Sequence, residues 1–129
     1  MKKLLLIFAL LFSTALYSSP VRAEWTQVSE NEDGNTFYVD LERIRKHDGY
    51  VYYWELWDYL KPSETGMLSS KSYVQADCKQ FRFKDLSFSS HKEPMGNGAA
   101  ETDNTPDKDW EYPSPNSSHE LLLKLVCSQ

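Results

Sequence analysis

Apolar and polar residues alternate with a period of two along much of the chain, a pattern typical of half-buried β-strands. Residues 36–41 show it clearly, with Phe37, Val39 and Leu41 on one side of the alternation. Residues 24–29 precede them with a poorer alternation. We therefore expect a strand over each of these two segments.

Residues 50–60 form the most aromatic segment of the chain. Aromatic side chains favour a pleated surface, and a strand without a polar face is usually covered on both sides. This favours a central strand that lies beneath a helix on one face and beneath loops or a partner chain on the other. The alternative interpretation is that one aromatic face stays open and binds an apolar or planar ligand.

Residues 81–88 change phase partway. Phe81 and Phe83 are two positions apart, as are Leu86 and Phe88, but the two pairs have opposite parity. One extra residue near Lys84-Asp85 would bring all four side chains to one face, which is the signature of a β-bulge. The alternative is two separate short strands.

Residues 91–109 contain glycines, prolines and small polar residues without periodicity, and we expect a loop there. A loop of this length is expected to be either mobile or functional. The aromatic residues Trp110 and Tyr112 then indicate a last short strand over 110–113. Pro113 restricts that strand to an edge of the sheet.

The C-terminal segment has the pattern of a helix. Ser117 and Glu120 have the spacing of a capping box. An apolar face follows, made of Leu121, Leu122, Leu125 and Val126. Cys127 lies off the centre of this face, so a disulfide from Cys127 would require the last turn to fray or rotate.

These elements predict an α+β fold: an antiparallel sheet of about six strands with the C-terminal helix packed on one face. Tight-turn signals at 33–34 and 48–49 make sequential strands neighbours, which favours a meander. The strand over 71–78 alternates well and points Cys78 to its inner side. Such a sheet has two edges, through which a homodimer could form.

The N-terminus has the organisation of a cleavable signal peptide. Two lysines precede an apolar run over 4–12, and Val21 and Ala23 fit the positions before a cleavage site. The run is too short for a membrane span, and no cysteine in residues 1–77 offers a lipid attachment point. We therefore expect residues 1–23 to be removed and residues 24–129 to be one exported domain, in the periplasm, at the cell surface or secreted, without a stable membrane anchor.

Two cysteines, Cys78 and Cys127, lie in the expected mature part. An even number of cysteines in an exported chain favours pairing, and two cysteines allow a single connection. A metal site and a redox pair are the competing interpretations. Neither is supported, because there is no Cys-x-x-Cys and no histidine at ligand spacing. We predict a structural disulfide that ties the helix to the sheet.

The expected mature part is acidic. Eleven of the 14 basic residues and all 19 acidic residues follow residue 23, which gives a net charge of −8. A negative surface repels phosphate backbones and anionic lipids. Nucleic acid and membrane surfaces are therefore not expected partners.

No pattern of catalytic or metal-binding residues stands out. His47, His91 and His119 lie at no motif spacing from a nucleophile or a carboxylate pair, and we expect all three on the solvated surface. Residues 103–109 carry three aspartates but lack the spacing of a calcium loop. We therefore expect no catalytic residue, no metal and no cofactor, and a protein that is not an enzyme.

The order of features resembles the surface-adhesin protein E family of Gram-negative bacteria. The match spans nearly the whole expected mature chain. The matching positions are Trp25, Tyr38-Val39-Asp40, Ile44-Arg45, Asp48-Gly49, Trp54, Asp58-Tyr59, Ser70-Lys71-Ser72, Asp77-Cys78, Pro94-Met95-Gly96, Trp110, Tyr112-Pro113 and Cys127.

The resemblance implies a six-stranded antiparallel sheet with a C-terminal helix held by the cysteine pair, and an adhesin that binds host proteins such as vitronectin, laminin and plasminogen. It also implies haem binding. Two functions follow as hypotheses. The first is a module that binds a protein, either a host extracellular-matrix or serum protein or an envelope partner. The second is a periplasmic protein that binds a small haem-like ligand. The matching motifs indicate framework positions, so the binding residues are left unassigned.

Overall fold

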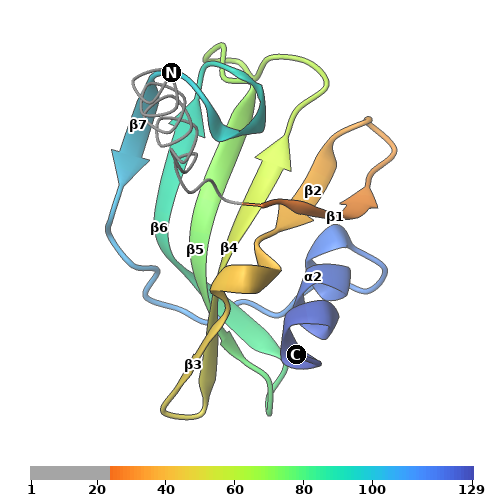
Figure 1. The fold of residues 1–129 in the computed structure, drawn as a ribbon, viewed down its shortest axis with the longest axis vertical. Coiled ribbons are helices and arrows are strands. Elements are labelled where there is room, and N and C mark those ends of the chain that lie inside the picture. Colours follow the sequence, from red (N-terminus) through yellow and green to blue (C-terminus); the bar gives the residue numbers. More distant parts are fainter. Residues whose placement is uncertain (1–23) are drawn as a thin grey trace, which may run out of the picture.

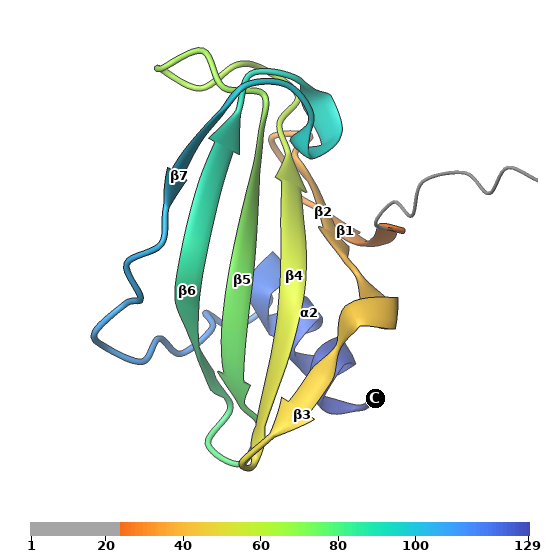
Figure 2. The same ribbon diagram turned by 60° about the vertical axis from the view of Figure 1, so that its left-hand side comes forward.

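The computed structural model describes residues 24–129, and the predicted signal peptide lies outside these described residues. They form one seven-stranded antiparallel sheet with a helix on one side (Figures 1 and 2). In chain order the elements are β1 (Thr26–Glu30), β2 (Thr36–Val39), η2 (Leu41–Arg43), β3 (Arg45–His47), β4 (Tyr50–Asp58), β5 (Ser69–Asp77), β6 (Arg82–His91), η3 (Pro94–Gly96), β7 (Ala100–Asp103) and α2 (Ser118–Cys127).

The sheet is a meander, as predicted. Its order is β1-β2-β4-β5-β6-β7, with β3 paired to β4 beyond the end of β2. The two strands β2 and β3 therefore pair with successive halves of β4. The turn from β3 to β4 has Asp48 and Gly49 both at positive φ, which is the backbone conformation of a type I′ hairpin turn.

Strand β4 divides its side chains between two environments because successive residues point to opposite faces. Val51, Tyr53 and Glu55 are buried on the face that carries α2. The core on that face contains Phe37, Val39, Val51, Tyr53, Val74, Ala76, Phe83, Leu122, Leu123 and Val126. The opposite face, which carries Tyr50, Tyr52 and Trp54, is called the open face below.

A β-bulge is present, as predicted, but it lies at Leu86 and not at 84–85, so Leu86 does not join Phe83 and Phe88 on one face. Tyr73 pairs with Ser87 and Val74 pairs with Asp85, which leaves Leu86 as the extra residue in β6. The change of phase in the sequence therefore corresponds to one strand with a bulge, and not to two separate short strands.

Two predictions for the segment after β6 were wrong. Within the expected loop at 91–109, residues 100–103 form β7, which pairs with 88–91. All four side chains of β7 are exposed, so the strand is held by backbone hydrogen bonds. Its sequence therefore has no apolar alternation from which a strand could be predicted. The strand expected at 110–113 reduces to a single bridge between Glu111 and Phe83, since Pro113 cannot extend the ladder.

Helix α2 begins as predicted. Ser117 Oγ accepts a hydrogen bond from the Glu120 amide at 3.2 Å. The Glu120 carboxylate accepts from the Asn116 amide at 3.4 Å, one residue earlier than in a standard capping box.

The apolar face of α2 is rotated from the predicted one. Leu121 is 47% exposed, whereas Leu122, Leu123 and Val126 are fully buried. Cys127 lies four residues after Leu123 and therefore shares the buried stripe. No fraying is needed for the disulfide, because the helix continues through Cys127.

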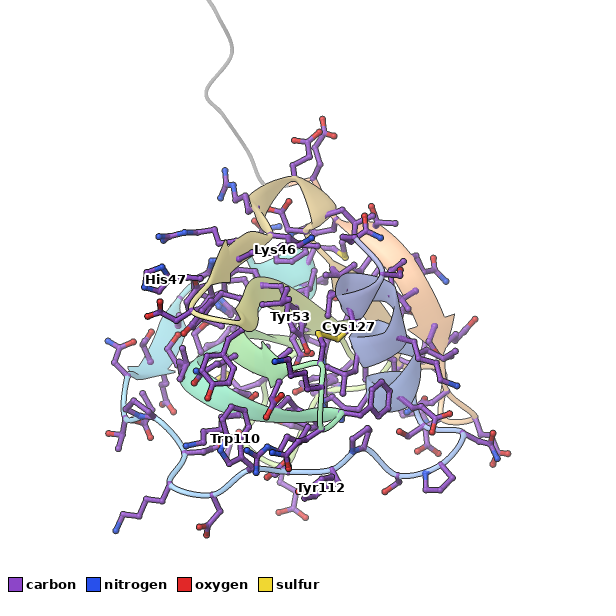
Figure 3. The ribbon with its side chains drawn as sticks, turned by 90° about the horizontal axis from the view of Figure 1, so that it is seen from below. Lys46, His47, Tyr53, Trp110, Tyr112 and Cys127 are labelled. Carbon is purple, nitrogen blue, oxygen red and sulfur yellow. A yellow bond between two sulfur atoms is a disulfide. The ribbon has the colours of Figure 1, made fainter. Side chains whose placement is uncertain are left out.

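The Cys78–Cys127 disulfide is present and ties the end of α2 to the end of β5, with the Cα atoms 5.7 Å apart (Figure 3). Its position is as the sequence predicted. The bond closes a loop between residues 49 apart in the sequence, and it lies beside the core.

Removing the disulfide should destabilise the protein strongly. Closing a loop of this length contributes about 4 kcal/mol in the chain-entropy description. We expect a double Cys78→Ala and Cys127→Ala variant to lose about this much free energy of unfolding, measured by urea denaturation. The variant should also be insensitive to reductant, which is the control. An unchanged free energy of unfolding would contradict the prediction.

Candidate functional site

The open face carries a cluster of three neighbouring aromatic side chains from the two central strands, of which Tyr52 and Tyr73 are stacked and Trp54 is tilted against Tyr73. Tyr73 lies between Trp54, at a centroid distance of 4.9 Å, and Tyr52, at 6.2 Å. The cross-strand register of β4 and β5 places Trp54 opposite Tyr73, and Gln75 donates a hydrogen bond to the Tyr52 hydroxyl at 3.2 Å. All three rings are partly exposed.

A further aromatic ring borders one side of this face. Trp110 comes from the extended segment after β7 and stacks on Tyr50 at 5.7 Å (Figure 3). Arg82 and Lys84 lie over the Trp110 ring at 4.5 and 4.6 Å from its centroid. These cation–π contacts fix Trp110 against β6, and the sequence did not predict them because the residues are far apart along the chain.

The open face is also rich in basic residues. By the register of the sheet, Arg45, Lys71 and Lys84 point to the same side as Tyr52 and Tyr73. Arg82 is there as well but is neutralised by Asp77, at 2.9 Å. The face therefore has a local excess of positive charge on a domain whose net charge is negative.

Next to the aromatic cluster is a hollow of about 190 Å³ lined by Trp25, Asp40, Arg43, Trp54 and Lys71. Asp40 is 1% exposed, and neither carboxylate oxygen has a hydrogen-bond partner. Arg43 Nε lies 3.5 Å from Asp40 Oδ2. The alternation of 36–41 places Asp40 on the polar side of its strand. The fold buries it there, which the local pattern does not show.

A second hollow of about 140 Å³ adjoins the cluster and is lined by Arg45, His47, Tyr52 and Tyr73. His47 is well exposed and lies 3.1 Å from Asp48. The prediction of a solvated histidine is confirmed for this residue.

The upper part of the same face is covered by η3. The Met95 amide donates to Asp58 Oδ1 and the Gly96 amide donates to Ser69 Oγ, both at 2.8 Å. Gly96 lies against Lys71 so closely that an added Cβ would be 2.9 Å from the Lys71 side chain.

The aromatic strand is therefore covered by α2 on one face and partly by η3 on the other, where Tyr52, Trp54 and Tyr73 stay partly exposed. Whether these rings bind an apolar or planar ligand stays a hypothesis.

Within residues 24–129, no group of three or more His, Cys, Asp or Glu side chains is arranged to hold a metal ion. Of the helices in that range, none has the length and apolarity needed to cross a bilayer.

Comparison with known proteins agrees with this architecture. The sequence pattern of the surface-adhesin protein E family matches residues 25–128. This chain belongs to the surface-adhesin protein E family. No curated protein matches the sequence.

Solved structures of Haemophilus influenzae protein E have a similar fold. Crystal form II is 16% identical, with a TM-score of 0.63, and the match covers 86% of this chain and 92% of that one. Protein E from non-typeable Haemophilus influenzae is 15% identical, with a TM-score of 0.58, over 86% of this chain and 80% of that one. At this identity, the likeness concerns the fold.

On the helix face, this member of the protein E family has a cluster of ionisable groups of which Glu55 is buried and Asp85 and His119 are half-buried. The His119 ring lies between Phe83, at 4.7 Å, and Trp57, at 4.9 Å. Its Nε2 atom lies 3.6 Å from Glu55 Oε1, and Glu55 is 1% exposed. The prediction that His119 is a solvated surface residue was therefore wrong. Packing of α2 on the sheet turns this side chain inward.

His91 was also expected on the solvated surface, and this prediction was wrong too. It is buried at the end of β6, where its Nε2 atom and Ser89 Oγ are 2.8 Å apart. Burial and the nearby Lys71 charge lower the pKa of His91. Its position under the loop that follows β6 depends on tertiary contacts that the local sequence does not encode.

Asp85 completes the cluster under α2. Burial raises the pKa of Asp85 to about 7, with further contributions from the charges of Glu55, Asp107 and Glu111 and an opposing one from His119. Burial alone would lower the pKa of His119, but the Glu55 carboxylate outweighs it and raises that pKa. Both shifts favour proton uptake by the folded state near neutral pH.

Stability should therefore fall as the pH rises through about 7. Folded Asp85 keeps its proton to about pH 7, whereas the unfolded side chain releases it near 3.8, so the folded state binds more protons between these values. The raised pKa of His119 continues this trend above 6.5. We expect Asp85→Asn to be more stable than the parent at pH 8, by on the order of 1 kcal/mol for a partly screened group. The two should be nearly equal only at about pH 3, below the unfolded pKa of 3.8, where Asp85 is protonated in both states.

Urea denaturation at the two pH values measures this difference. The parent protein at about pH 3 is the matched control, since its Asp85 is then neutral like the asparagine in both the folded and the unfolded state. The same stability difference at both pH values would mean that Asp85 does not titrate in this range.

Proposed function

We propose that this chain is an exported, non-catalytic binding protein whose open face binds a protein partner. Residues 1–23 direct export, and residues 24–129 form the single binding domain. The partner is a host extracellular-matrix or serum protein, or a protein of the bacterial envelope. The observation that carries the proposal is the group of half-exposed aromatic side chains, with Arg45 beside them, on the part of the open face that η3 leaves uncovered.

The composition of this face suits protein recognition. Tyrosine, tryptophan and arginine are enriched among the residues that contribute most to binding at protein interfaces. Tyr52, Trp54 and Tyr73 are already stacked in the free protein, so little side-chain entropy is lost when they are covered. The surrounding cations would attract an acidic surface of the partner.

Family membership supports the same conclusion. Membership of this family fits export and an adhesive role. Protease treatment of intact and of opened cells distinguishes a location at the bacterial surface from one in the periplasm. Digestion in intact cells supports a host partner. Protection until the outer membrane is opened supports an envelope partner.

Replacing the central ring of the cluster should abolish partner binding. We expect Tyr73→Ala to weaken binding at least tenfold, the effect of removing an interface residue that contributes strongly. The measurement is biolayer interferometry of the exported protein against immobilised matrix, serum and envelope proteins. Phe88→Ala is the matched control, because Phe88 is an exposed aromatic residue opposite Ser72 on the other face of the sheet. Equal binding by both variants would contradict the proposal.

The second hypothesis, a haem-like planar ligand, is supported by the same stacked rings. However, the two hollows beside them measure about 190 and 140 Å³, whereas clefts for drug-sized ligands are about 300–1,000 Å³. We therefore expect that titration of the exported protein with haem gives no saturable Soret shift that depends on these rings. A shift that is lost in Tyr73→Ala would make the small-ligand function the correct one.

A further inference from the structure

On one side the sheet ends at β7, and within the described residues no strand lies beside the outer edge of β7. The strand order places β7 next to β6 at the end of the sheet, and Figure 2 shows it as the outermost strand. All four of its side chains are exposed. The N–H and C=O groups along such an edge are a template on which another extended chain can pair.

The hydrogen-bond pattern of the β6–β7 hairpin shows which backbone groups of β7 point outward. The Lys92 amide donates to the Ala99 carbonyl at 3.1 Å, just before the paired residues of the two strands begin. Hydrogen-bonded and non-hydrogen-bonded pairs alternate along an antiparallel ladder. Counted from Ala99, the odd-numbered residues of β7 direct their backbone groups to β6. Ala100 and Thr102 therefore direct their N–H and C=O groups away from the sheet.

The two outer strands of the sheet differ in how well they suit the addition of a strand. The pairing of β1 with β2 shifts in register between Gln27 and Ser29, and Ser29 Oγ lies 3.0 Å from Ser118 Oγ at the start of α2. A bulge twists an edge and opposes pairing with another chain. The pairing of β7 with β6 is in continuous register, so its edge is the regular one.

The charge along this edge selects the kind of strand that can pair with it. Residues 92–109 contain five carboxylates and two lysines, and two minus five gives a net charge of −3. Glu101 and Asp103 project from β7 on the same side as Phe88 of β6. The Thr105 amide donates to Asp103 Oδ1 at 2.9 Å, which lowers the pKa of Asp103. Basic side chains two positions apart on an added strand would lie opposite both carboxylates.

We propose that the outer edge of β7 binds an extended basic segment of a protein partner by strand addition. In an antiparallel arrangement, one residue of the segment lies opposite Thr102 and exchanges backbone hydrogen bonds with it. The residues on either side of it are lysine or arginine and lie opposite Glu101 and Asp103. These two pairs are non-hydrogen-bonded, so their side chains approach closely. This site goes beyond the open face and does not depend on the function proposed for that face.

The probe for this site is the peptide acetyl-Thr-Lys-Val-Lys-Val-amide, which has its two lysines two positions apart. The isotopically labelled exported protein is titrated with the peptide, and amide hydrogen exchange is followed residue by residue. At saturation we expect exchange of the Ala100 and Thr102 amides to slow by about tenfold or more, as for amides that enter a ladder. The amides of β1 should keep their rates. Unchanged exchange in β7 would overturn the inference.

Two matched peptides separate charge pairing from strand addition. A peptide with glutamate in place of both lysines keeps the backbone and reverses the charge, so it should bind on the order of tenfold more weakly or not at all. A peptide N-methylated at both valines keeps the lysines but loses the donors that face β7, so its affinity should also fall on the order of tenfold. Equal binding of either peptide and the original probe would contradict the inference.

Variants of the chain locate the contact. Thr102→Pro removes an outward N–H, a change that edge strands tolerate, and should lower the peptide affinity about fivefold or more. Thr102→Ala is its matched control and should bind like the parent. Glu101→Gln should lower the affinity about twofold to fivefold, whereas Glu64→Gln, an exposed residue between β4 and β5, should leave it unchanged. Equal affinities of Thr102→Pro and Thr102→Ala would show that the peptide binds elsewhere.

Two further outcomes would assign the peptide or the edge differently. Tyr73→Ala changes the open face and should leave the peptide affinity unchanged, since distant sites act independently. Loss of peptide binding in Tyr73→Ala would place the peptide on the open face and overturn the inference. Protection of the Ala100 and Thr102 amides that grows with protein concentration, without peptide, would assign the edge to a second copy of the chain. Because the peptide replaces the partner, failure of the proposed function leaves these results unaffected.

Discussion

The structure depends on the fact that β4 carries large side chains on both faces and therefore needs cover on both. Its alternation sends Val51, Tyr53 and Glu55 under α2, where they meet the core. The same alternation sends Tyr50, Tyr52 and Trp54 to the other side, where η3 and the Trp110 segment cover only part of the surface. The exposed remainder is the candidate binding face. Its existence follows from one strand of nine residues and a single helix.

The sequence predicts the local features of this arrangement better than the features that depend on contacts between distant segments. The strands over 36–41 and 71–78, the bulge in 81–88 and the helix cap each depend on neighbouring residues, and these predictions are confirmed. Strand β7 pairs through its backbone with exposed side chains, so no pattern marks it. The site residues Asp40 and Trp110 owe their environments to contacts with distant segments, which single-sequence patterns do not report.

The distribution of charge gives the two faces of the sheet different chemistry. On the helix face, the buried Glu55 lies beside the half-buried His119, whose ring packs on Phe83, and burial raises the pKa of the neighbouring Asp85. On the open face, Lys71 and Arg45 stay partly hydrated beside tyrosines and tryptophans. The net charge of the domain is negative, but the register of the sheet brings Arg45, Lys71 and Lys84 to one face. Recognition of acidic groups by an acidic protein is therefore physically reasonable.

The short outer strand β7 also affects how the protein behaves at high concentration. A free sheet edge is a template on which other chains can add strands and grow into fibrils. Here that edge is four residues long and carries Glu101 and Asp103, and β1, at the other end of the sheet order, ends in Glu30. Two copies brought edge to edge would meet with like charges. The sheet can thus leave its aromatic face uncovered for a ligand and still resist aggregation through its margins.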